Sequence, residues 1–265
     1  MIRVENLTKQ FIRPTSGKWY FGQGGKTEVV QAVKNISFNA EDGKITGLLG
    51  ANGAGKTTSL RMIAALLKQD GGQILVDGTA VQAGQQVTQA QMGVLSDARG
   101  LYPRLSAREN IVYYGVLHGM TREQSNQRVD VLAQVLEMKS FIERRCEGFS
   151  QGEKMKTALA RALVHDPKNI ILDEPTNGLD VLATRGLRDF LRWLRSPEGG
   201  SKCIIFSTHI MQEVERLCDH VVVVAHGKTV AQGSVQQLLD LVDETDFETA
   251  FVKLAFDPAY NKELV

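Results

Sequence analysis

One segment restricts the possible folds of this chain more than any other feature. Gly50–Thr57 has the sequence GANGAGKT, which matches the pattern G-x4-G-K-[ST]. The apolar run Ile45–Leu49 before it predicts a buried strand, and apolar residues at helical spacing over Leu60–Leu67 predict a helix that ends at Gly71–Gly72. A strand, a glycine-rich turn and a helix in this order are typical of a phosphate-binding loop. The segment therefore predicts an α/β protein that binds ATP.

The chemistry of such a loop depends on its residue types. Glycines let backbone N–H groups turn inward around an anion, and the following helix directs its unpaired N–H groups at the same point. The Lys56 ammonium then neutralises charge on the β- and γ-phosphates, and the Thr57 hydroxyl is a ligand for Mg²⁺. The alternative, a glycine-rich turn without a ligand, is disfavoured by the strand and helix around it. The predicted ATP-binding residues of the loop are Gly50, Asn52, Gly53, Ala54, Gly55, Lys56, Thr57 and Thr58.

Further short apolar runs predict the rest of a sheet. Strands that alternate with helical segments imply right-handed crossovers, and hence a mostly parallel sheet covered on both faces. The runs Val221–Ala225 and Thr229–Ala231, with His226–Gly227 between them, predict a hairpin. The predicted strands are Gln73–Val76, Met92–Leu95, Ile170–Leu172, Cys203–Phe206, Val221–Ala225 and Thr229–Ala231.

Two stretches interrupt this alternation. Residues 13–28 are rich in glycine and polar residues and predict an inserted loop or hairpin. Residues 104–164 have helical patterns and almost no strand signal, which indicates a helical subdomain inserted into the sheet. The expected organisation is an ATP-binding core with a β subdomain over 1–97 and 165–234, a helical subdomain over 98–164 and a helical tail over 235–265.

The apolar run Ile170–Leu172 ends in two acids, Asp173 and Glu174. At the carboxyl end of a parallel strand beside a phosphate loop, one acid can hold hydrated Mg²⁺ and the next can deprotonate water. Asp173 is therefore the predicted metal ligand and Glu174 the predicted general base. Taken alone, two acids after a strand usually mark a solvated turn. The phosphate loop upstream reverses that interpretation.

A helix start at Phe149–Glu153 is informative because of its glycine. Ser150 and Glu153 form an S-x-x-E capping box, so an ordinary helix start is the simplest interpretation. Gly152 in the first turn costs about 1 kcal/mol relative to alanine. That cost makes sense if a phosphate bound by another chain approaches the backbone here, which predicts Ser150 and Gly152 as ATP contacts.

Together these motifs resemble the nucleotide-binding subunit of ABC transporters, and the resemblance covers nearly the whole chain. The resemblance implies a P-loop ATPase core with a mostly parallel sheet, an antiparallel β subdomain and an inserted α-helical subdomain. It also implies hydrolysis of ATP with Mg²⁺. The family's motifs occur in the family's order at Gly50–Thr58, Phe149–Glu153, Asp173–Glu174, Asn177–Asp180 and His209.

The resemblance further implies a head-to-tail dimer, either a homodimer or a pair with a paralogous ATPase subunit. The family's signature motif corresponds to Phe149–Glu153, at the start of a helix. Each ATP would lie between the phosphate loop of one subunit and this signature helix of the other. Asp180 would communicate across the dimer, and His209 would contact the γ-phosphate and hold the attacking water. A lone histidine is more often a core or capping residue, so the role of His209 depends on the series of motifs.

An aromatic side chain is expected to stack on adenine, a contact worth about 1 kcal/mol. By its match to the family, Phe11 at the end of the first predicted strand is the aromatic residue expected to stack on adenine. Trp19, Tyr20 and Phe21 in the predicted insertion are alternatives for the same role.

The chain departs from the family pattern at two places. Asp97 stands where most members have a glutamine, and it is either a metal-site residue that reaches Mg²⁺ through water or an exposed loop acid. Gln151 and Glu153 stand in the signature where glycine and glutamine are usual. With the stretches Gly100–Ile111 and Asp246–Phe251, this variant signature resembles the exporter subgroup that includes bacterial sodium-efflux ATPases.

Composition bears on partners and location. The 31 basic and 30 acidic residues give a net charge of +1, so no nucleic-acid partner is expected. No segment approaches the apolar run of about 18 residues that crosses a bilayer, and charges near the N-terminus argue against a signal peptide. The 3 widely spaced cysteines suit a reducing cytoplasm. We expect a peripheral protein on the cytoplasmic face of the cell membrane, bound to an integral-membrane permease subunit.

Two other functions compete with a transport ATPase. A non-transport ABC ATPase that acts on ribosomes or DNA usually has two cassettes or a long coiled coil, and this chain has one phosphate loop and no sustained heptads. A regulatory module that senses ATP without turnover is disfavoured by the intact loop lysine, strand acids and His209. The sequence therefore favours a transport ATPase, and the subgroup resemblance favours an exporter with sodium as its substrate.

Overall fold

The computed structural model describes residues 1–14, 27–84, 89–96 and 100–261. The strands are Ile2–Pro14 (β1), Thr27–Ala40 (β2), Ile45–Leu49 (β3), Gly71–Val76 (β4), Thr79–Ala80 (β5), Met92–Leu95 (β6), Asn169–Asp173 (β7), Cys203–Thr208 (β8), His220–Ala225 (β9) and Lys228–Gly233 (β10). The helices are Lys56–Ile63 (α1), Ala107–Leu117 (α3), Arg122–Val135 (α4), Gln151–Leu163 (α5), Val181–Arg195 (α6), Met211–Leu217 (α7), Val235–Leu241 (α8), Phe247–Phe256 (α9) and Pro258–Asn261 (α10).

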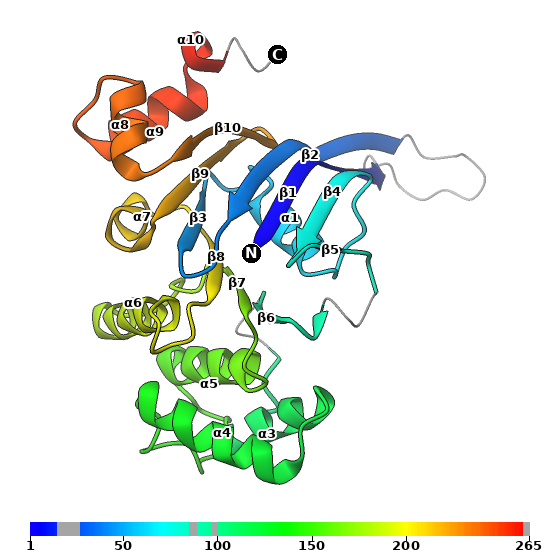
Figure 1. Cartoon of the computed structure of the whole chain (residues 1–265), viewed down its shortest axis with the longest axis vertical. Coiled ribbons are helices and arrows are strands. Elements are labelled where there is room, and N and C mark those ends of the chain that lie inside the picture. The colour runs from blue at the N-terminus through cyan, green and yellow to red at the C-terminus, as the bar shows by residue number, and fades with distance from the viewer. Residues whose placement is uncertain (15–26, 85–88, 97–99, 262–265) are drawn as a thin grey trace.

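The strands form one sheet in the order β5-β4-β1-β2-β10-β9-β3-β8-β7-β6 (Figure 1). From β9 to β6 the neighbouring strands are parallel, whereas β1, β2, β4 and β5 pair in antiparallel fashion. Strand β10 pairs with β2 on one side and with β9 on the other, and so joins the two parts. The predicted α/β class, with a mostly parallel core and an antiparallel β part, is confirmed.

The parallel strands are buried on both faces because successive side chains point to opposite sides of a sheet. In β7, Ile170 and Leu172 pack in a hydrophobic core shared with α3, α4, α5 and α6. Ile171, between them, packs in a second core that contains the apolar residues of α1. The apolar run therefore needs helices on both faces, as predicted.

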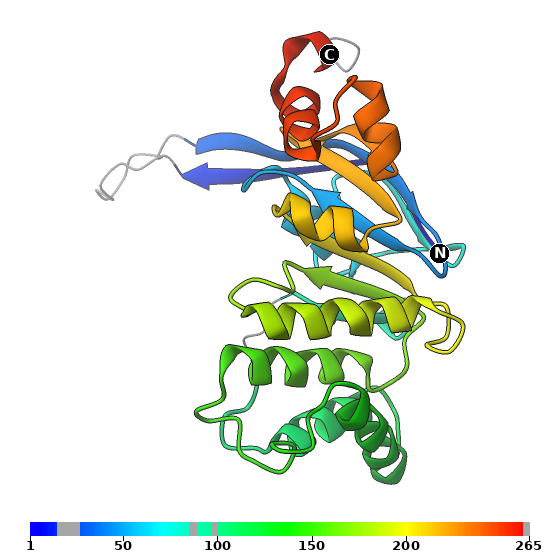
Figure 2. The same ribbon diagram turned by 90° about the vertical axis from the view of Figure 1, so that its left-hand side faces the viewer.

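The helices α3, α4 and α5 form a layer beyond the parallel end of the sheet (Figures 1 and 2). Each begins with a capping box, in which Ser106, Thr121 or Ser150 exchanges hydrogen bonds with the third helical residue. These helices lie within residues 98–164, whose limits as a subdomain remain a prediction. The tail helices α8 and α9 pack on β9 and β10 at the opposite end of the molecule (Figure 1).

The helix after the phosphate loop is shorter than predicted. It ends at Ile63, and Ala65 then adopts a positive φ of 56°. Gly71–Gly72 begin β4 instead of ending the helix. A Cβ at Gly72 would lie 2.4 Å from the Asn6 carbonyl oxygen. This glycine therefore permits the close approach of β4 to β1.

The ends of the predicted insertion are arms of an antiparallel hairpin, because Arg13 pairs with Glu28 and Pro14 with Thr27. Residues 15–26 lie outside the described ranges, and Trp19, Tyr20 and Phe21 with them. No helix in the described part of the chain has the length and apolar character needed to span a membrane.

Candidate active site

The carboxyl ends of β3, β7 and β8 bring the predicted chemistry to one edge of the sheet. The parallel register pairs Leu49 of β3 with Thr208 of β8, and Asp173 of β7 with Ser207 of β8. The phosphate loop follows β3 directly, Glu174 follows β7, and the predicted histidine follows β8. Three segments that are far apart in the sequence therefore meet because their strands are neighbours.

The glycines of the phosphate loop have identifiable structural reasons. A Cβ at Gly50 would lie 2.3 Å from the carbonyl oxygen of Val224, and one at Gly55 would lie 2.7 Å from that of Ala32. Gly53 has a φ of 83°, and no atom lies within 4 Å of its Cβ position. Helix α1 begins without a side-chain cap, so the N–H groups of its first turn are free to bind an anion. These features fit a phosphate-binding nest.

Lys56 is the buried cation of this loop, with 4% of its side chain exposed. Its ammonium donates hydrogen bonds to the carbonyl oxygens of Gly50 at 2.7 Å and Ala51 at 3.1 Å. Burial lowers the pKa of Lys56, and the nearby charges of Glu174 and Asp173 oppose that shift. A desolvated cation beside unpaired N–H groups is strongly attracted to a polyphosphate.

The two acids differ in their surroundings. Asp173 accepts two hydrogen bonds on Oδ1, from Thr57 Oγ1 at 3.0 Å and from Ser207 Oγ at 2.6 Å. Glu174 leaves the strand with a positive φ of 46°, and its N–H donates to Ser207 Oγ at 3.0 Å. Asp173 thus lies against the loop threonine, whereas the Glu174 side chain points in a different direction.

Glu174 lies between the loop lysine and the predicted histidine. Its Oε1 is 3.9 Å from Lys56 Nζ and 3.4 Å from His209 Nδ1, and 43% of the histidine side chain is exposed. Thr208 Oγ1 accepts from the Ile210 N–H at 3.0 Å, which fixes the turn that presents His209. The structure therefore brings Lys56, Thr57, Asp173, Glu174 and His209 together, and their roles toward ATP remain predictions.

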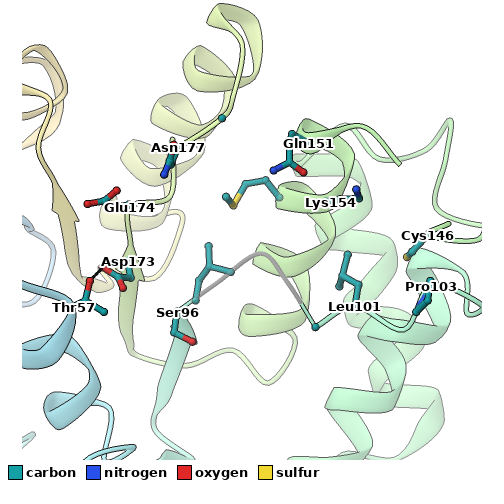
Figure 3. A pocket seen from close by; sticks show the side chains of 14 residues that line it. Thr57, Ser96, Leu101, Pro103, Cys146, Gln151, Lys154, Asp173, Glu174 and Asn177 are labelled. Carbon is teal, nitrogen blue, oxygen red and sulfur yellow. Dashed lines mark hydrogen bonds between the residues drawn. The ribbon is translucent and has the colours of Figure 1, made fainter. Parts of the chain in front are cut away.

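A cleft of about 790 Å³ opens beside these residues (Figure 3). Thr57, Asp173 and Glu174 line one wall, and Gln151 and Lys154 of α5 line the other. Pockets of about 300 to 1,000 Å³ hold typical small-molecule ligands. The cleft lies between the sheet and the helical layer, and Thr57 is the residue of the phosphate loop that lines it.

Three predicted ATP contacts, Ser150, Gly152 and Asp180, line a different hollow of about 250 Å³, whose lining contains no residue of the phosphate loop. Ser150 caps α5 by accepting from the Glu153 N–H at 3.2 Å. Asp180 caps α6 by accepting from the Ala183 N–H at 2.8 Å. Ser150, Gly152 and Asp180 thus share one surface of the molecule, and their roles toward ATP remain predictions.

Phe11 is not at the end of its strand, because β1 continues to Pro14. It pairs with Val30 of β2, and Lys9 Nζ lies 5.7 Å from the centroid of its ring. Two residues further along β2, the Ala32 carbonyl adjoins the phosphate loop. Stacking of Phe11 on adenine stays a prediction, and Asp97 lies outside the described residues.

Ser207 is not among the residues that the sequence predicts for this site. The strand predicted over Cys203–Phe206 stops one residue before it, and a single serine after an apolar run carries no signal of its own. Its contacts depend on the register of β8 against β7, which only the folded sheet defines.

Thr57 and Asp173 provide oxygen atoms of the kind that Mg²⁺ prefers as ligands. In the described ranges, no group of three or more His, Cys, Asp or Glu side chains could enclose a metal ion. Thr57 and Asp173 offer two oxygen ligands side by side. Mg²⁺ typically takes few protein oxygens and completes its shell with water and phosphate oxygens, so these residues fit it.

The fold and this site define a P-loop nucleotide-binding protein with an inserted helical layer. A family model described as ABC transporter matches residues 33–177. The chain is 40% identical over 228 residues to the ABC transporter ATP-binding protein NatA of Bacillus subtilis (strain 168), which covers 86% of this chain and 92% of that protein. The chain therefore belongs to the family of ABC transporter ATP-binding proteins, and it is an ATPase.

The chain is also similar to other ATP-binding proteins of ABC transporters. The Nod factor export ATP-binding protein I of Paraburkholderia xenovorans (strain LB400) is 38% identical over 209 residues, which are 78% of this chain and 67% of that protein. A solved ATP-binding subunit of an ABC transporter superimposes with a TM-score of 0.78 at 24% identity, covering 96% of this chain and 98% of that one. The dimeric ABC transporter cassette MJ0796 has a TM-score of 0.75 at 23% identity, covering 88% and 98%. These structural likenesses confirm the fold.

Proposed function

We propose that this protein is the ATP-hydrolysing subunit of an exporter and drives a separate membrane-spanning subunit from the cytoplasmic face of the cell membrane. The observation that carries the proposal is the meeting of Lys56, Glu174 and His209 at one edge of the sheet, beside the Thr57–Asp173 pair. Similarity to NatA and to a Nod factor export protein supports the transport role.

Each residue of this group has a distinct part in the proposed reaction. Lys56 and the loop N–H groups bind the β- and γ-phosphates, and Thr57 and Asp173 hold Mg²⁺, which when bound neutralises charge on the phosphates. Glu174 takes a proton from the attacking water, and His209 holds that water against the γ-phosphate. The contacts of the Glu174 carboxylate, 3.9 Å from Lys56 and 3.4 Å from His209, support these roles.

The proposed site is completed by a second subunit in a head-to-tail dimer. Ser150, Gly152 and Asp180 of that subunit contact the ATP held by the first phosphate loop. Next to Asp180, the apolar side chains of Val181 and Leu182 are 81% and 79% exposed. A subunit that covers this face would bury them, as interfaces usually do with exposed apolar groups. The dimeric cassette among the structural neighbours supports this assembly.

The membrane subunit is proposed to dock on the helical layer. Tyr102, Tyr113 and Leu117 are 45%, 43% and 62% exposed there. The two tyrosine rings meet edge to face with centroids 5.5 Å apart. Aromatic residues of this kind often form the energetic centre of protein interfaces.

Sodium is the proposed substrate of the exporter. The support is the resemblance of the variant signature and of the stretches Gly100–Ile111 and Asp246–Phe251 to sodium-efflux ATPases. Substrate contacts themselves would belong to the membrane subunit.

Affinity purification of the full chain from its native membranes tests the proposal. An integral-membrane protein with several spans is expected to copurify with the wild-type chain. The double variant Tyr113→Ser, Leu117→Ser is expected not to bind that membrane protein. The purified double variant should still hydrolyse ATP at the wild-type rate. Val131→Ser on α4, another exposed apolar side chain, is the matched control. Copurification of ribosomes or DNA would contradict the transport role and favour a non-transport ABC ATPase.

A further inference from the structure

Ser207 lies between the two acids of the active site. It is the residue of β8 that pairs with Asp173 across the sheet, and it is fully buried at 0% exposure. A buried hydroxyl is costly unless it is hydrogen-bonded. In the described part of the chain, the hydrogen bonds of this hydroxyl go to the two acids.

The first of these bonds orients the metal-binding acid. Ser207 Oγ donates to Asp173 Oδ1 at 2.6 Å, and Thr57 Oγ1 donates to the same oxygen at 3.0 Å. Hydrogen bonds to a carboxylate are strong, and two donors on one oxygen restrict rotation of the group. Within the described ranges, Oδ2 is then the oxygen left to face a hydrated cation.

The second bond holds the backbone of the general base. Ser207 Oγ accepts from the Glu174 N–H at 3.0 Å, and the Ser207 carbonyl oxygen accepts from the same N–H at 3.2 Å. Glu174 needs this support because its φ of 46° is uncommon for a residue with a Cβ. The bonds fix the point where the chain leaves β7 and the side chain turns toward Lys56 and His209.

We infer that Ser207 is a positioning residue for both acids of the ATPase site. Its proton orients Asp173 toward the metal ion, and its lone pair fixes the backbone of Glu174. It acts through these residues and touches neither ATP nor the reacting atoms. This inference rests on the roles proposed above for Asp173 and Glu174.

The test compares Ser207→Ala with Ser125→Ala in the full-length protein. The control removes another fully buried hydroxyl, which donates to the Thr121 carbonyl oxygen at 2.9 Å in the helical layer. The affinity for a fluorescent ATP analogue is measured with Mg²⁺ and with EDTA. The phosphate loop binds the analogue under both conditions, whereas Asp173 contributes only through the cation.

For Ser207→Ala, we expect the ratio of the affinity with Mg²⁺ to the affinity with EDTA to fall about 10-fold, because residues that orient metal ligands typically have this effect. The kcat is expected to fall by about 10- to 100-fold. The KM measured with Mg²⁺ is expected to rise along with the loss of affinity, because KM approaches the dissociation constant when chemistry is slow. Ser207→Thr keeps the hydroxyl and is expected to recover most of the affinity ratio and of kcat. Ser125→Ala should leave the ratio unchanged.

An affinity ratio and a kcat that both equal the wild-type values in Ser207→Ala would overturn the inference. Equal losses of affinity with Mg²⁺ and with EDTA would also overturn it, because they would indicate a general structural role. The ratio is measured without hydrolysis and therefore tests Ser207 independently. A wild-type protein without turnover would instead contradict the proposed function.

Discussion

The side chains of Glu174 and His209 meet where β7 and β8 end, with Oε1 of the glutamate 3.4 Å from Nδ1 of the histidine. The same oxygen lies 3.9 Å from Lys56 Nζ. One carboxylate therefore adjoins both the buried cation of the phosphate loop and the residue proposed to hold the attacking water. Changes at these residues should separate binding of ATP from its hydrolysis.

Lys56→Ala is expected to weaken ATP binding about 30-fold or more, because charge-assisted hydrogen bonds to phosphate are worth roughly 2 kcal/mol or more. Fluorescence titration of the purified protein with an ATP analogue measures the effect. Lys139→Ala removes an exposed lysine of the helical layer and is expected to change the affinity less than about twofold, since exposed charges contribute little. Unchanged affinity in Lys56→Ala would refute the assignment of the phosphate loop.

Gly50→Ala is expected to lower the free energy of unfolding by about 1 to 3 kcal/mol, the usual effect of overpacking. The added Cβ would lie 2.3 Å from a backbone oxygen, that of Val224. Gly186→Ala is the opposite case, because no atom lies within 4 Å of its Cβ position on α6. Alanine in a helix should there add about 0.5 to 1 kcal/mol. Urea unfolding measures both, and equal effects would be inconsistent with close packing around Gly50.

The stacked pair His118–His165 is expected to make the free energy of unfolding depend on pH. The rings lie 3.7 Å apart at an interplanar angle of 2°. Burial, with a smaller contribution from His118, lowers the pKa of His165 from 6.5 to about 4. The unfolded chain therefore takes up this proton at a higher pH than the folded chain does. Stability is lost as the pH falls from about 6.5 toward about 4.

After an allowance for partial exposure, this proton uptake should cost about 2 kcal/mol. Urea unfolding of the wild type and of His165→Gln at about pH 7 and about pH 4.5 measures the cost. The variant is expected to lose less stability than the wild type over this interval. Identical losses in the two proteins would show that His165 does not titrate in this way.

Much of this site could be predicted because its signals are local. The phosphate loop lies between its strand and its helix within one short segment, and Asp173 and Glu174 follow an apolar run directly. The prediction that helix α1 ends at Gly71–Gly72 is wrong. These glycines instead allow β4 to approach β1 closely. A glycine pair indicates a backbone constraint but not which element imposes it.

The contacts of Ser207 could not be predicted in the same way. They depend on which strands become neighbours and on the register of β7 against β8. A motif series gives the order of such residues along the chain. Their distances follow only from the complete sheet.

ATP should assemble two copies of the chain when hydrolysis is blocked. Glu174→Gln with ATP and Mg²⁺ is expected to elute from gel filtration as a dimer, and as a monomer without nucleotide. The double variant Glu174→Gln, Leu182→Asp should form a weaker dimer. Leu182 is 79% exposed, and the substitution would place a charge in the proposed interface. A Glu174→Gln protein that stays monomeric with ATP would contradict the shared site.

The role of Glu174 in hydrolysis is tested most directly by the rate at which Glu174→Gln releases phosphate from saturating ATP, with the exposed-residue variant Glu147→Gln as control. Loss of a general base typically costs about 100-fold or more in rate, so the predicted result is a drop of at least that size with ATP affinity unchanged. Glu147→Gln should keep the wild-type rate. Hydrolysis by Glu174→Gln at the wild-type rate would contradict the assignment of Glu174 as the base.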